Sequence, residues 1–119
     1  MIRYTFLAVV LLCTMSIGCT TTQKQYYFGE YSDTLYDFEK NRTEDTLLEH
    51  KQQLEHIVAE SKDKNLNVPP GIYAELGYIY MRQNNAKQAA ELFSKEAELY
   101  PESRQFMDRL IRQSDKTKI

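Results

Sequence analysis

The stretch from Pro70 to Ser103 restricts the fold of this chain more than any other part of its 119 residues. Its large apolar residues recur at helical spacing on both sides of Asn84-Asn85. That pair suits a tight turn, because asparagine tolerates left-handed backbone angles. Gly77 and Ala89 lack bulk, so a helix on each side of the turn can approach the other closely. The pattern therefore predicts a helical hairpin.

The same stretch resembles a tetratricopeptide repeat, whose period is about 34 residues. Glu96 replaces the alanine at one of the eight signature positions of that family, and a generic hairpin that meets the pattern by chance is the alternative. One such repeat cannot bury its own faces, and the sequence contains no second copy, so flanking helices must cap it. The seven matching positions are Tyr73, Leu76, Gly77, Tyr80, Ala89, Phe93 and Pro101.

Further helices are expected on both sides of the hairpin. Thr43 is a suitable N-cap for a long helix that reaches about Lys64, and Ser32 can cap a shorter one. No segment alternates as a half-buried strand would. We therefore expect an all-α fold over residues 30–114, in which flanking helices cap a tetratricopeptide-like hairpin, and a frayed tail at 115–119. The expected helices cover about 32–40, 44–64, 71–83, 86–99 and 104–113.

The N-terminus is typical of a targeting segment, with one positive charge before a short apolar run. The run ends at Ser16–Cys19, which resembles the lipobox of bacterial lipoproteins; an ordinary signal that leaves an unmodified thiol is the alternative. The resemblance implies a cleaved signal peptide over residues 1–18, lipidation of Cys19, and an anchored tether over 19–29. Thr20 after the cysteine implies sorting to the outer membrane, by resemblance to enteric bacteria.

Composition argues against an enzyme, a metal centre and a nucleic-acid binder. The formal net charge of −2 gives no basic surplus for phosphate backbones, and two cysteines cannot form a four-ligand zinc site. His50 and His56 are six residues apart on one helix, so they point to different faces. No nucleophile elbow and no glycine-rich phosphate loop is present. We expect no metal, no cofactor, no small-molecule substrate and no catalytic residues.

Charge and aromatic residues are distributed unevenly. The net charge is −6 from Glu30 to Asp63 and +3 from Arg104 to Lys118, a dipole that either steers a partner or reflects solvated helix faces. Six aromatic residues occur between positions 26 and 38. They either anchor the chain at an interface, attract a partner, or form one apolar stripe that closes over the bundle. The stripe consists of Tyr27, Tyr31, Leu35 and Phe38.

Taken as a whole, the chain resembles a domain-of-unknown-function family of small Gram-negative lipoproteins. The resemblance rests on the lipobox, on residues 26–32, on the junction at 68–73 and on residues 100–110. The family has no assigned activity, and its genes typically lie beside those of lipoproteins resembling the curli secretion channel. The resemblance implies an outer-membrane assembly, with the protein held by lipid at the periplasmic face.

A binding face follows from the tetratricopeptide resemblance, because ligands of that family lie against the first helix of each repeat. The family's carboxylate clamp has lysine and asparagine where this chain has Ala74 and Tyr78, so we expect an apolar or aromatic peptide instead, with Arg82 at the rim. The alternative is that the helix at 43–64 covers this face. The candidate partner-binding residues are Ala74, Tyr78, Met81 and Arg82.

The expected function is therefore that of a non-enzymatic, lipid-anchored adaptor, which binds another envelope protein such as a lipoprotein of a curli-secretion-like assembly. The alternative is a structural envelope lipoprotein that acts by self-association or by contact with the cell wall. An envelope hydrolase is a weaker third reading.

Overall fold

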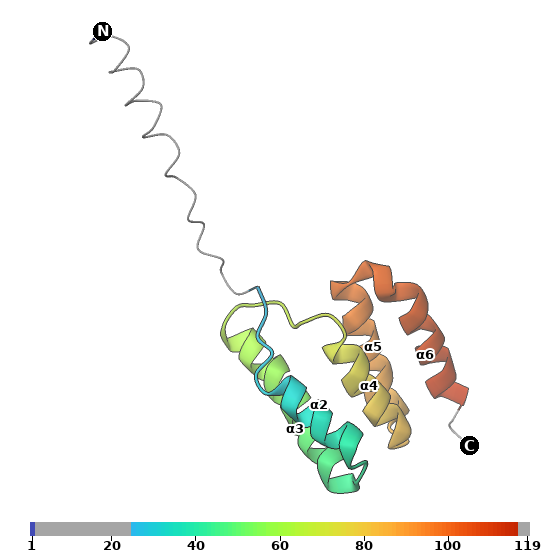
Figure 1. Cartoon of the computed structure of the whole chain (residues 1–119). Coiled ribbons are helices and arrows are strands. Elements are labelled where there is room, and N and C mark those ends of the chain that lie inside the picture. Colours follow the sequence, from blue (N-terminus) through green and yellow to red (C-terminus); the bar gives the residue numbers. More distant parts are fainter. Residues whose placement is uncertain (2–24, 117–119) are drawn as a thin grey trace.

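The computed structural model describes Met1 and residues 25–116, and all regular structure in this range is helical (Figure 1). The all-α prediction is thereby confirmed for that range. The expected signal peptide beyond Met1, Cys19 and residues 117–119 lie outside the described residues. No helix in the described part is long and apolar enough to cross a membrane. The elements are α2 (Tyr31–Lys40), α3 (Glu44–Asp63), α4 (Ile72–Arg82), α5 (Ala86–Leu99), η2 (Pro101–Ser103) and α6 (Arg104–Lys116).

Each helix packs mainly against its neighbours in the chain. The central pair is α4 and α5, with α3 against α4 on one side and α6 against α5 on the other (Figure 1). The expected hairpin is therefore present, and helices flank it on both sides as predicted. In addition, α2 lies along α3, so these two elements form a second helical hairpin that precedes the central one.

Two apolar clusters hold the helices together, one on each side of the central hairpin. The first joins α3 to α4 and α5, and we call it the α3-side core. The second joins α5 to α6, and we call it the α6-side core. The α3-side core consists of Leu54, Ile57, Val68, Ile72, Leu76, Ile79 and Leu92. The α6-side core consists of Ala89, Phe93, Ala97 and Met107.

α4 and α5 approach each other closely at Gly77, as the sequence predicted. A Cβ atom on residue 77 would lie only 2.8 Å from Cε1 of Phe93 and 3.3 Å from the carbonyl oxygen of Ala89. Phe93 is completely buried. Because Gly77 has no side chain, the Phe93 ring can occupy the space beside its Cα atom.

Local caps define several helix ends. The Thr43 side chain accepts a hydrogen bond from the Thr46 backbone amide, and Thr46 reciprocates, so the predicted N-cap of α3 is confirmed. Asn84 has the left-handed φ of 60° expected in the α4–α5 turn. The Ser32 cap is wrong: α2 begins one residue earlier, after Glu30, with no side-chain cap. The last helix also extends to Lys116, beyond its expected end.

Glu96 has a role that the alanine of the tetratricopeptide signature could not have. Its side chain is only 3% exposed, and Oε1 accepts a hydrogen bond of 2.7 Å from the backbone amide of Gly71, the N-cap residue of α4. Gly71 has a left-handed φ of 91°, where glycine is favoured. A carboxylate from α5 therefore satisfies a free amide at the start of α4.

We expect Gly77→Ala to destabilise the fold by about 1–3 kcal/mol, because the added methyl group overlaps the Phe93 ring. Phe93→Ala should cost about 3–5 kcal/mol by leaving a cavity. The double variant should cost less than the sum of the two, since the smaller residue at position 93 makes room for the methyl group. Urea unfolding measures all three, with the exposed Glu98→Ala as a near-neutral control. Additive costs would contradict the proposed contact.

Candidate functional site

A groove of 690 Å³ lies between α2, α3 and α4. Its volume is in the range of sites that hold a ligand or a short peptide. Apolar side chains from all three helices line it, namely Leu35, Phe38, Leu47, Tyr78 and Ile79. Tyr78 is 47% exposed, so the groove presents an aromatic ring to solvent.

Charged side chains of both signs surround this apolar lining. Arg42, which follows α2, forms an ion pair with Glu39 one turn earlier in the chain. Glu44 lies in the first turn of α3 and also lines the groove. Arg82, at the end of α4, has no hydrogen bond or ion pair to any described residue. Arg82 is thus a cation of the groove that is available to an acidic group on a partner.

His50 is the centre of a polar network beneath the groove. Its side chain is 1% exposed, and its Nδ1 lies 2.9 Å from Oγ1 of Thr34 on α2. Its Nε2 lies 2.9 Å from Oε1 of Glu75 on α4, and because a carboxylate only accepts, Nε2 donates this bond. Tyr31 donates to the other Glu75 oxygen at 3.0 Å. One buried imidazole therefore joins three helices.

Two aromatic rings of α2 enclose His50. Phe38 stacks on the imidazole with an interplanar angle of 1° and a centroid separation of 6.4 Å. Tyr31 tilts against it at 5.6 Å. Burial raises the pKa of Tyr31 to about 12, and the charge and hydrogen bond of Glu75 add to the shift. These contacts fix α2 over α3 and so define one wall of the groove.

The four predicted binding residues do not share one environment. Tyr78 and Arg82 line the groove. The helix α3 also contributes to this groove, but it leaves the Tyr78 side chain half-exposed. Ala74 and Met81 instead pack against the α6-side core, beside residues of α6. The structure therefore brings only Tyr78 and Arg82 together in the groove, whereas Ala74 and Met81 face the α6-side core. A binding role for the four residues stays a prediction.

Sequence reasoning missed His50, although a signal was present. His50 is four residues before Leu54, seven before Ile57 and eleven before Ser61, which is the spacing of one helix face. All four are buried. A histidine on an apolar face requires a polar partner, but nothing in the sequence indicates that Glu75, far along the chain, provides it.

The second histidine, His56, lies apart from the His50 network. His56 is exposed, and its ring contacts Tyr27 edge-on at a centroid separation of 5.9 Å. No group of three or more histidine, cysteine or acidic residues within the described residues is arranged to hold a metal ion.

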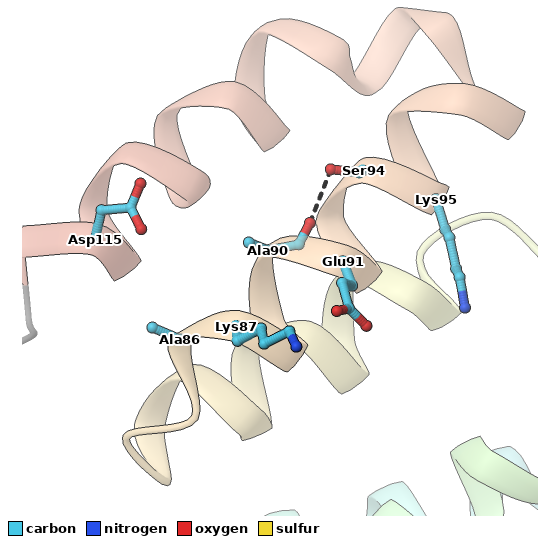
Figure 2. A pocket seen from close by; sticks show the side chains of 7 residues that line it. All are labelled: Ala86, Lys87, Ala90, Glu91, Ser94, Lys95 and Asp115. Carbon is cyan, nitrogen blue, oxygen red and sulfur yellow. Dashed lines mark hydrogen bonds between the residues drawn. The ribbon is translucent and has the colours of Figure 1, made fainter.

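A second hollow, of 650 Å³, lies on α5 beside the last turn of α6 (Figure 2). It exists because Ala86, Ala90 and Ser94, spaced four residues apart, have small side chains, and the Ser94 hydroxyl donates to the Ala90 carbonyl at 2.8 Å. Figure 2 shows Asp115 on α6 across from these residues. We take the α2–α3–α4 groove as the candidate site, because the buried His50 network lies beneath it.

Comparison with protein families gives a match over residues 25–110, to a family described as a domain of unknown function, DUF4810. The chain belongs to the DUF4810 family. The match begins where the described structure resumes and ends within α6, so the DUF4810 region contains both cores, the groove and the His50 network. Neither the search of curated proteins nor that of solved structures found a match.

The raised pKa of Tyr31 makes the stability of this DUF4810 domain dependent on pH in the alkaline range. An unfolded tyrosine ionises near pH 10, whereas Tyr31 in the fold ionises near 12. Its contribution is therefore complete below pH 10 and is lost as the pH rises from 10 to 12. We expect the melting temperature to fall across this interval, and to fall less in Tyr31→Phe.

The control for this measurement is Tyr36→Phe, because Tyr36 is an exposed tyrosine of the same helix. Tyr80 and Tyr100 also have raised pKa values, so part of the fall should remain in every variant. An equal fall in wild type and Tyr31→Phe would show that the Tyr31–Glu75 contact does not form.

Proposed function

We propose that this DUF4810 protein is a lipid-anchored, non-enzymatic adaptor that binds another cell-envelope protein in the α2–α3–α4 groove. The observation that carries the proposal is the groove itself, in which an exposed Tyr78 ring lies beside apolar residues and an unpaired Arg82. Aromatic and arginine side chains supply much of the binding energy at protein interfaces. The expected occupant is an extended or helical segment with apolar side chains and an acidic group opposite Arg82.

The His50 network supports a groove that is largely formed before its partner binds. Hydrogen bonds from His50 reach both walls, because Thr34 belongs to α2 and Glu75 to α4. A preformed site loses less conformational entropy on binding than one that must assemble. This is the behaviour expected of an adaptor surface, and the resemblance of the central hairpin to a tetratricopeptide repeat points to the same class.

The anchoring part of the proposal rests on the sequence around Cys19. Its lipobox-like tetrad and the Thr20 that follows favour a diacylated lipoprotein of the outer membrane, at the periplasmic face. Several acyl chains anchor a protein stably, whereas one chain binds only marginally. By family resemblance, we place the protein as an accessory of a curli-secretion-like outer-membrane assembly.

Tyr78→Ala and Arg82→Glu should each weaken capture of the partner several-fold without unfolding the domain, because both side chains are exposed. The matched controls are Tyr36→Ala and Arg112→Glu, which change an exposed tyrosine and an exposed arginine outside the groove. Crosslinking and co-purification from detergent-solubilised membranes measure capture, and circular dichroism verifies folding. Unchanged capture in both groove variants would exclude the groove as the binding site.

The same purification separates the adaptor from a structural envelope lipoprotein. A stoichiometric foreign protein, lost in the groove variants, supports the adaptor. Recovery of only self-oligomers or of peptidoglycan would overturn the adaptor and favour the structural role.

Cys19→Ser should move the protein from the membrane fraction to the soluble fraction and abolish incorporation of labelled palmitate. Cys13→Ser is the matched control, because that cysteine lies within the expected signal peptide and should leave with it. If Cys19→Ser still incorporates palmitate, or wild type never does, the lipid anchor is wrong.

A further inference from the structure

Residues 25–28 form a strap across one end of the fold. Tyr27 and His56 of α3 form a hydrogen bond of 3.3 Å between the hydroxyl and Nε2. Tyr26 lies near Tyr100, which follows α5, and burial together with Tyr26 raises the pKa of the Tyr100 hydroxyl. That hydroxyl donates to the Val68 carbonyl at 2.5 Å. The strap thus contacts α3 of the first hairpin and the residue that follows α5 of the second, so the point where the preceding chain enters the fold is fixed.

The strap lies at the end of the bundle that contains two of its connections. The α3–α4 connection (64–71) and the α5–α6 connection (100–104) lie at this end (Figure 1). We call these segments, together with residues 25–28, the tether end. The α2–α3 and α4–α5 turns lie at the opposite end of the helices, which we call the distal end (Figure 1).

The side chains of the tether end suit a lipid interface. Phe28 in the strap is 48% exposed, and Pro70 and Pro101 are exposed in the two connections. Phe106, also exposed, is in the first turn of α6, where side chains project back toward the start of the helix. Tyr26 and Tyr100 add rings with a polar edge, which are favoured at the boundary between water and lipid.

The charges at the tether end are few and nearly balanced. Its only ionisable side chains of acidic or basic type are Lys64, Glu102 and Arg104. The tether end therefore carries no charge barrier to a zwitterionic bilayer, and contact with it does not require anionic lipid.

We propose that the tether end rests on the surface of the bilayer that holds the anchor, and that the groove faces away from it. The inference rests on the proposed anchor at Cys19. Five residues separate Cys19 from Gln25, so six extended steps of the chain place the strap at most about 20 Å from the lipid surface. At that distance the exposed Phe28 and Phe106 rings can reach the interface, and the strap fixes the point at which the tether enters the domain.

This orientation determines from which side a partner arrives. Arg82 lies ten residues beyond Ile72 on α4, or about 15 Å along the helix axis from the tether end. The groove residues Glu39 and Glu44 are likewise near the distal end. The occupant of the groove is therefore an aqueous segment of the partner, not a part that is embedded in the membrane.

The test uses the mature chain, residues 19–119, with a maleimide phospholipid coupled to Cys19 and inserted into phosphatidylcholine vesicles. Of the described residues, this mature chain lacks only Met1, and chemical coupling makes the result independent of whether cells acylate Cys19. The chain contains no tryptophan, so a single one introduced by Asn67→Trp or Asn41→Trp is a unique fluorophore. Both asparagines are exposed, one at the tether end and one at the distal end.

Brominated phosphatidylcholine should quench the fluorophore of Asn67→Trp several-fold more than that of Asn41→Trp. Phe28→Ser should reduce the difference, whereas the control Tyr36→Ser, which changes an exposed ring away from the tether end, should not. The difference should persist without anionic lipid and after Gly-Ser repeats are inserted between Thr22 and Gln23. Equal quenching at both positions, or loss of the difference with the longer tether, would overturn the proposal.

This outcome is separable from the adaptor function and from natural lipidation. Capture of a partner depends on Tyr78 and Arg82, and palmitate labelling reports on Cys19 in cells. If capture fails while the quenching difference remains, the groove proposal falls and the orientation stands. If capture succeeds with equal quenching, the adaptor stands and the orientation is wrong.

Discussion

The fold depends on the contact between the Phe93 ring and the bare backbone of Gly77. Because this contact brings α4 and α5 together, the two faces of the hairpin point in opposite directions and each must be covered. The α3-side core covers one face and the α6-side core the other. Each flanking helix is thus held by apolar burial against a hairpin that could not be stable by itself.

Buried hydrogen bonds fix the relative positions of the helices that the two apolar cores hold together. The α2–α3 hairpin meets the central one through few backbone neighbours, and the buried bonds of His50 with Thr34 and Glu75 fix the two relative to each other. Glu96 has a comparable effect at the same N-terminal end of α4, where it accepts a hydrogen bond from the Gly71 amide. Partnered polar groups in a core favour one arrangement over its competitors, since any shift leaves a buried atom without its bond.

The sequence predicted those features whose causes are local. The start of α3 at Thr43, the turn at Asn84 and the close approach at Gly77 each depend on residues within a turn or on a spacing within one hairpin. The start of α2 was misplaced because packing of Tyr31 against Glu75 and His50 outweighs the capping ability of Ser32. Ala74 and Met81 were grouped with Tyr78 and Arg82, although they pack against the α6-side core, because the position of that core follows from tertiary packing. Lipidation of Cys19 and the identity of the partner stay predictions.

The strap also has a mechanical consequence. A pulling force applied to the chain before residue 25 acts first on the contacts of Tyr26 and Tyr27, and only then on the first turn of α2. These rings contact α3 and the residue that ends α5, so the load is shared between both hairpins and does not peel α2 away from α3. A pull on the chain that precedes the strap would for that reason leave the α2–α3–α4 groove intact.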